Sequence, residues 1–188
     1  MLFGALVSVT NGSSWSIGVS LSLILGIAWS WAALGLGCGV AQPRARDGAI
    51  AAAVGLLAAV GSYYLTDLSR GVYRSLDPAD PTRTFTNWGG AVRDWLVWSV
   101  ISLIVGPVFG ALGARARRGD LFGLACRLVV PLIAVVETSW RLPQELAVQP
   151  RPLAVSTLTT TRWLALGCAV LLIATHVTLR RRPTPRRR

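Results

Sequence analysis

The chain contains five apolar stretches that are each long enough to cross a lipid bilayer as a helix. The hydrocarbon core of a bilayer is about 30 Å thick and a helix rises about 1.5 Å per residue, so a span needs about 20 mainly apolar residues. The stretches predict spans at about 17–40, 48–66, 92–114, 120–137 and 162–179. We therefore expect an all-α, polytopic transmembrane helix bundle of about five spans, forming a single domain over residues 1–179.

Composition agrees with a membrane location. Of the 188 residues, 53% are hydrophobic and only 14% are charged, and the mean hydropathy is +0.54. An ordinary soluble domain carries about 25% charged residues. The formal net charge of +11 comes from arginine alone, but the arginines lie between the apolar stretches and at the C-terminus. They do not mark one basic face, so we expect no nucleic-acid partner and a multi-pass protein of the cell membrane.

Arginine and tryptophan positions predict the orientation. Short cytoplasmic loops carry an excess of arginine, and tryptophan gathers at membrane boundaries. An outside N-terminus places on the inner side Arg44, Arg46, Arg115, Arg117, Arg118 and the six arginines of 180–188. The outer side then carries Arg70, Arg74, Arg83, Arg93, Arg141, Arg151 and Arg162, together with most of the acidic residues. Six of the eight tryptophans fall near the outer boundary, whereas Trp29 and Trp31 lie in the middle of the first span.

The remaining segments are short. Residues 180–188 are rich in Arg and Pro and predict a disordered cytoplasmic tail that attracts anionic lipids. Residues 1–9 are apolar but too short to span, so they form either an interfacial segment or the remnant of a longer start. No basic residue precedes them, so we expect no cleaved signal peptide. The Pro-containing segments 76–86 and 143–152 predict loops.

Polar residues cluster at the predicted outer ends of the spans. They are Asp67, Arg93, Asp94, Glu137 and Arg162. Carboxylates at or inside a membrane often mark a solute or proton pathway, so one interpretation is a polar rim around an extracytoplasmic vestibule. The other interpretation is a set of ion pairs that fix the helix ends.

Arg127 lies about two turns into the fourth predicted span and needs a partner there, because an unpaired arginine inside a membrane costs a few kcal/mol. Its side chain either extends to the inner head groups or donates to a backbone carbonyl. Pro107 provides one candidate acceptor, since a proline leaves the carbonyl four residues earlier, that of Leu103, without its usual donor.

Glycine spacing, single cysteines and missing motifs indicate which contacts and which kinds of site to expect. The GxxxG spacings Gly35 with Gly39 and Gly106 with Gly110 predict close helix pairing, within the chain in preference to a dimer. Cys38, Cys126 and Cys168 sit singly in apolar stretches and predict neither a disulfide nor a zinc site. The sequence has no HExxH, GxSxG or P-loop motif, so we expect no metal, no cofactor and no enzymatic activity.

Three segments resemble an uncharacterised family of small multi-spanning membrane proteins from high-GC Gram-positive bacteria. They are 11–15 (NGSSW), 63–65 (YYL), and 96–98 (LVW) leading to 106–110 (GPVFG). The resemblance implies a membrane location and no particular activity.

Three functions remain open at this point. The first is a non-enzymatic accessory or structural membrane component that works with a membrane-protein partner or as a homo-oligomer. The second is a small transporter or solute-binding component that uses the polar rim. The third is an intramembrane enzyme acting on lipid, which has only the rim carboxylates in its favour.

Overall fold

The computed structural model describes residues 2–78, 80, 82–148 and 151–181. Over these residues the chain forms seven helices and one short β-hairpin, which confirms the predicted all-α class. The elements are α1 (Leu2–Asn11), α2 (Ser16–Leu25), α3 (Ala28–Val40), α4 (Ala45–Ser69), β1 (Arg74–Leu76), β2 (Thr84–Thr86), α5 (Trp88–Ala116), α6 (Leu121–Val148) and α7 (Pro152–Arg181). The predicted tail lies outside the described residues, apart from the end of α7.

Within the described part of the chain, α4, α5, α6 and α7 are each long and apolar enough to cross a membrane. Helices α2 and α3 satisfy the same criteria only together, and they are bent by 61° relative to one another. The protein is therefore a multi-pass helical membrane protein with four spans, or five if the bent pair counts as one. The prediction of one continuous helix over 17–40 is wrong.

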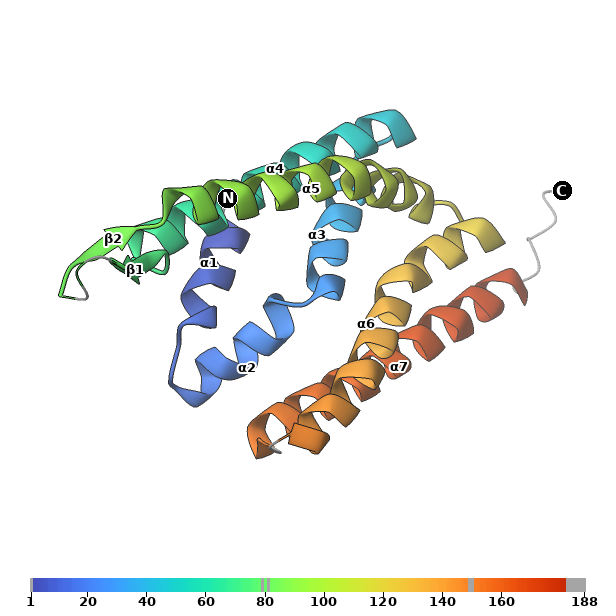
Figure 1. The fold of residues 1–188 in the computed structure, drawn as a ribbon. Coiled ribbons are helices and arrows are strands. Elements are labelled where there is room, and N and C mark those ends of the chain that lie inside the picture. Colours follow the sequence, from blue (N-terminus) through green and yellow to red (C-terminus); the bar gives the residue numbers. More distant parts are fainter. Residues whose placement is uncertain (1, 79, 81, 149–150, 182–188) are drawn as a thin grey trace, which may run out of the picture.

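The helices form two antiparallel pairs that diverge from a common turn. Helices α4 and α5 pack along each other, and α6 packs along α7 at a large angle to the first pair (Figure 1). Helix α3 lies between the pairs and contacts α4, α5 and α6, while α2 packs on α7. Helices α5 and α6 are joined at residues 117–120 and separate from there onward.

Glycines allow α3, α4 and α5 to meet backbone to backbone. A Cβ atom added at Gly39 would overlap the carbonyl oxygen of Gly110, and one added at Gly110 would overlap the carbonyl oxygen of Gly48. At Gly106 it would lie 2.9 Å from the Cα of Ala53. Both GxxxG motifs therefore serve packing within the chain, as predicted.

The N-terminal apolar segment forms α1, which packs on α4 and α2. Val7 and Ser8 are fully buried, and a Cβ atom at Gly4 would overlap the carbonyl oxygen of Ala59. The segment is thus part of the packed helical domain.

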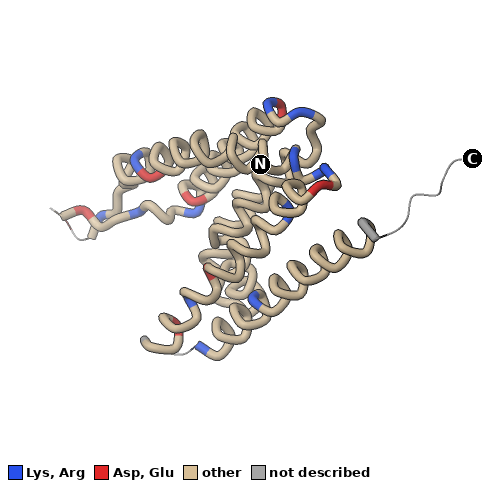
Figure 2. The backbone as a smooth tube through the Cα atoms, turned by 90° about the vertical axis from the view of Figure 1, so that its right-hand side faces the viewer, with Lys and Arg blue, Asp and Glu red and all other residues tan. Residues whose placement is uncertain are grey.

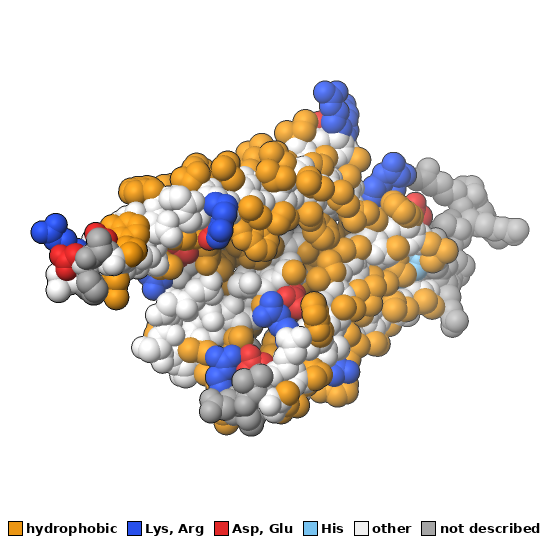
Figure 3. Space-filling view, in the orientation of Figure 1, with side chains coloured by type: hydrophobic (Ala, Val, Ile, Leu, Met, Phe, Trp, Pro, Cys, Tyr) orange, Lys and Arg blue, Asp and Glu red, His pale blue; other side chains and the backbone are white. Residues whose placement is uncertain are grey.

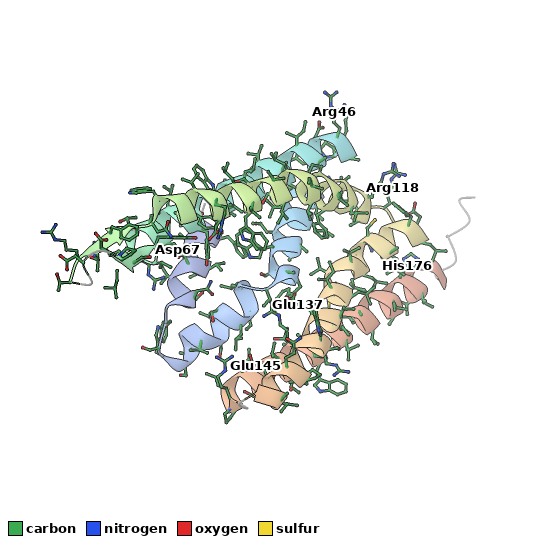
Figure 4. The ribbon with its side chains drawn as sticks, viewed as in Figure 1. Arg46, Asp67, Arg118, Glu137, Glu145 and His176 are labelled. Atoms are coloured by element: carbon green, nitrogen blue, oxygen red, sulfur yellow. The ribbon has the colours of Figure 1, made fainter. Side chains whose placement is uncertain are left out.

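Many charged residues lie near the ends of the long helices, while α6 and α7 also carry charged residues along their length (Figure 2). Arg46 at the start of α4 lies at the same end of the molecule as Arg118, just after α5 (Figure 4), and Arg117 donates to the carbonyl of Gln42 at 3.4 Å. This grouping is what alternate crossings of a membrane would produce. Which end faces the cytoplasm remains a prediction.

The two predicted loops contain regular structure in their described residues. Within segment 76–86, Leu76 and Thr84–Thr86 belong to the strands of a hairpin, in which Arg74 pairs with Thr86 and Leu76 with Thr84. The described part of segment 143–152 is mostly helical, because α6 continues through Pro143 to Val148 and α7 begins at Pro152. Proline is well suited to the first position of a helix, where its missing N–H group needs no partner.

Candidate functional site

The break between α2 and α3 forms one wall of a cavity. Ile27 is buried and extended, with φ −106° and ψ 161°, so a new helix begins at Ala28. The hydroxyl of Ser30 lies 2.6 Å from the carbonyl oxygen of Leu25 and 2.7 Å from that of Ile27, and it donates to them. A broken helix is tolerated in a membrane only where its backbone groups find such partners.

Glu137 on α6 binds the start of α3. Its carboxylate oxygens accept the N–H groups of Ala28 and Trp29, each at 3.2 Å. The first N–H groups of a helix have no partner within the helix and carry partial positive charge, so a carboxylate is favoured there. Arg141, one turn further along α6, donates to the same carboxylate at 3.1 Å. The break is therefore stabilised by a helix distant in sequence (Figure 4).

A cavity of about 480 Å³ lies beside this break. Five helices contribute to its walls, namely α1, α3, α4, α5 and α6. Most of the wall is apolar or aromatic, with Trp31 from α3, Val60 from α4 and Phe109 from α5. Pockets of about 300–1,000 Å³ with apolar walls and a few polar groups are typical of small-molecule sites.

The polar groups of the cavity are few and come from different helices. Asn11 on α1 donates to the Tyr63 hydroxyl on α4 at 3.1 Å, and Ser102 is a buried hydroxyl residue on α5. Among the described residues that line the cavity, the charged ones are Glu137 and Arg141. In the space-filling view an acidic and a basic side chain lie together near the centre of the face between the two helix pairs (Figure 3).

A second, shallower hollow adjoins the cavity. It shares Ala28, Ile133, Glu137 and Arg141 with the first, and it continues along α6 past Trp140. The acid–base pair therefore stands between an inner apolar cavity and an outer apolar hollow.

The predicted rim residues do not form one group. Asp67 is 5% exposed and accepts the Ser8 hydroxyl at 2.6 Å, while the guanidinium of Arg70 donates to the carbonyl of Ser8. Asp67 thus fastens α1 to the end of α4 and does not line the cavity. Figure 4 shows it well separated from Glu137.

Asp94 belongs to the hairpin end of the molecule. Arg93 pairs with it at 3.2 Å, and the Tyr73 hydroxyl donates to it at 3.3 Å. Burial, together with the nearby Asp94 carboxylate, raises the pKa of Tyr73 to about 12. Arg162 is half-buried on α7 and pairs with none of the described residues. Of the predicted rim, only Glu137 reaches the cavity.

Arg127 donates to the end of α5. Its Nε lies 2.6 Å from the carbonyl oxygen of Ala116, and its Nη2 lies 2.8 Å from that of Arg118. The last carbonyls of a helix lack partners within the helix, so this contact closes the α5 terminus. The suggested acceptor, the carbonyl of Leu103, is not the one used.

Other candidate groups do not gather into a site. His176 is buried on α7, and its Nε2 has no hydrogen-bond partner among the described residues (Figure 4). Cys126 is buried, Cys38 is half-buried and Cys168 is exposed, all as free thiols. No three His, Cys, Asp or Glu side chains of the described segments lie close enough to hold a metal ion.

Sequence reasoning did not single out Arg141, Ser30 or the break at Gly26. Glu137 and Arg141 are four residues apart, which is the spacing of an ion pair on one helix face. This spacing is informative only once α6 is known to extend beyond residue 137.

No known protein family, curated protein or solved structure matches the chain. The resemblance to proteins of high-GC Gram-positive bacteria therefore stays a prediction.

Proposed function

We propose that this membrane protein is a non-enzymatic solute-binding component, or a small transporter, whose binding site is the cavity at the broken helix. The observation that carries the proposal is the position of Glu137 and Arg141, the charged pair of a mainly apolar cavity, at the N-terminus of a half-helix. The site replaces the vestibule expected from the rim residues.

Two physical arguments support this function. Charged side chains within or near a membrane are costly and are retained mainly where they pair or take part in function. Transporters place substrate sites at interrupted helices, where half-helix termini and unwound backbone supply polar groups without lipid exposure. The break at Ile27 has these features, because Ser30 and Glu137 satisfy its backbone while the neighbouring space remains unfilled.

A pair of phenylalanine substitutions on α3 tests the proposal. Ala32 is buried and lines the cavity, so Ala32→Phe places a ring inside it. Gly37 is exposed on the same helix with nothing within 4 Å of an added Cβ, so Gly37→Phe adds an equal ring outside. Mass spectrometry of gently extracted protein should find a small molecule retained by the wild type and Gly37→Phe and absent from Ala32→Phe. Equal retention by a folded Ala32→Phe variant would contradict the proposal.

An accessory subunit is the second candidate, favoured by the divergence of α5 and α6. Trp98 on α5 and Val136 on α6 are apolar side chains left exposed on either side of this gap. A helix of a partner protein, or of a second copy, would bury them. A cross-linker attached to Trp98→Cys in native membranes should then join the protein to one defined partner protein or to a second copy. Cross-links to lipid and to no protein would exclude this function.

A further inference from the structure

The chemistry of the cavity identifies a ligand class, on the assumption that the proposed function is correct. We propose that the cavity binds a single-chain amphiphile with an anionic head group, of the fatty-acid kind, which enters sideways from the bilayer. The chain lies in the inner cavity, whose walls come from α1, α3, α4, α5 and α6, and the head group lies on Arg141.

The charge of the site favours an anion over a cation. The Glu137 carboxylate is already engaged by two backbone N–H groups and by Arg141, and its side chain is 12% exposed. The helix terminus itself adds partial positive charge at this point. A cation approaching Glu137 would have to displace these donors.

Arg141, in contrast, has binding capacity left. Its side chain is 45% exposed; its Nε donates a hydrogen bond to Glu137, and its Nη2 lies 3.1 Å from the same carboxylate oxygen as an ion pair. An arginine carries five N–H donors in a planar fork, so donors remain for a second carboxylate. Because the start of α3 offsets part of the charge of Glu137, Arg141 is the charged group of the cavity that can still bind a further anion.

The shape of the cavity favours one apolar chain. Its volume of about 480 Å³ suits one small molecule of the size that such pockets usually hold. The wall beyond the acid–base pair is formed mainly by apolar side chains such as Trp31, Leu56 and Val105, and its few polar groups include Ser102 and the Asn11–Tyr63 pair. A polar solute would leave its own groups unpaired against them, at a cost of desolvation.

The position of the cavity entrance indicates that the ligand comes from the lipid bilayer. The cavity lies where α5 and α6 separate, and Trp98 and Ile101 on the α5 side are exposed. The adjoining outer hollow is lined by Leu132 and Val136, which are also exposed. Exposed apolar side chains on membrane-spanning helices face lipid, so the acid–base pair is reached along a lipid-facing surface (Figure 3).

The test uses photoactivatable palmitate and, as a neutral probe with the same chain, photoactivatable hexadecanol. The full chain is placed in nanodiscs of zwitterionic lipid, and labelled residues are mapped by mass spectrometry. Palmitate should label the inner wall, including Trp31 or Phe109, and unlabelled palmitate should compete. Arg141→Gln should weaken this labelling by about tenfold or more, because a hydrogen bond to a charged group is lost. Arg141→Lys, which keeps the charge, should retain most of it.

Matched variants separate head-group binding from general damage. Arg151 pairs with Glu145 at 2.6 Å away from the cavity, so Arg151→Gln removes a similar ion pair and should leave labelling unchanged. Ala32→Phe should abolish labelling of the inner wall by both probes while labelling of outer lipid-facing residues continues.

Several outcomes would overturn the ligand assignment. Equal labelling by hexadecanol with no effect of Arg141→Gln would show that no anionic head is recognised. Competition by acetate or inorganic phosphate as effective as by palmitate would show a water-soluble anion instead. Palmitate confined to the outer faces of α5 and α7, or a partner helix cross-linked in the gap, would also refute it. In each of these cases the proposed function would still be supported if the wild type retained a small molecule that the Ala32→Phe variant did not.

Discussion

Helices α3, α4 and α5 meet through glycines, whereas α5 and α6 separate and leave a cavity between them. In the first region Gly39, Gly48 and Gly110 bring backbones into direct contact. In the second, large side chains such as Trp98 and Ile133 line the space and one carboxylate holds the broken helix in place. Lipid is as apolar as the helices, so close packing of small residues is what drives helices together in a membrane. Where large side chains keep two helices apart, a pocket can persist.

The largest expected effect concerns the glycine contact. Gly110→Ala should lower the free energy of unfolding by about 3 kcal/mol, because the new methyl group overlaps the backbone of Gly48. Gly37→Ala, which adds the same group in open space, should raise it slightly, by about 0.5–1 kcal/mol, because alanine favours a helix over glycine. Thermal unfolding in detergent measures both. Equal values would remove the distinction between the two regions.

The next effect concerns the attachment of α1. Asp67→Ala should cost about 2 kcal/mol, since it leaves the buried Ser8 hydroxyl without its charged acceptor. Asp67→Asn keeps an acceptor oxygen and should cost less. Limited proteolysis should release the N-terminal helix sooner in the alanine variant. An unchanged cleavage rate would show that Asp67 does not hold α1, and would reopen its role as a rim residue.

A smaller, local effect is expected at the break. Glu137→Ala should cost about 1 kcal/mol, the usual effect of losing the acceptor at a helix N-terminus. Hydrogen exchange of the Ala28 and Trp29 amides should accelerate, because both lose their acceptor. Amides in the α4–α5 contact should be unaffected. Protection that is lost equally in both regions would mean that they unfold as one unit.

The smallest expected effect is a change in the pKa of Asp80 in the hairpin, outside both regions. Hydrogen bonds from the hydroxyl and backbone N–H of Thr82 lower the pKa of Asp80. A carboxyl group with a lowered pKa in the folded state stabilises that state above its unfolded pKa, and this contribution is lost as the pH falls through the folded value. NMR titration should show the pKa rising toward its ordinary value in Thr82→Ala. No change would show that the turn is not formed in solution.

The long spans were predictable from the sequence, but their ends and the break were not. Hydropathy identified α4 to α7, yet it placed the start of the last span at residue 162 because Ser and Thr precede it. In the helix these hydroxyls bond their own backbone, as Thr157 does to Leu153 and Thr161 does to Thr157. An average over an apolar stretch also cannot detect an interruption such as that at Gly26.

The candidate site was predictable only in part. Glu137 was identified as a polar residue at a span end, but its partners lie more than a hundred residues away on α3. Asp67 looked equivalent in the sequence, but it is a buried residue that attaches α1 to α4 through Ser8. Which carboxylate faces a cavity depends on how the helices diverge, and the periodicity of each helix alone does not contain that information.

The central claim is that a ligand occupies the gap between α5 and α6 at the Glu137–Arg141 pair. A cryo-electron microscopy structure of the protein in nanodiscs containing palmitate, with a bound antibody fragment to help particle alignment, tests it directly. The account predicts a single elongated density in the cavity, with its polar end on Arg141. Helix α6 closed onto α5, with the cavity filled by the protein's own side chains, would contradict it.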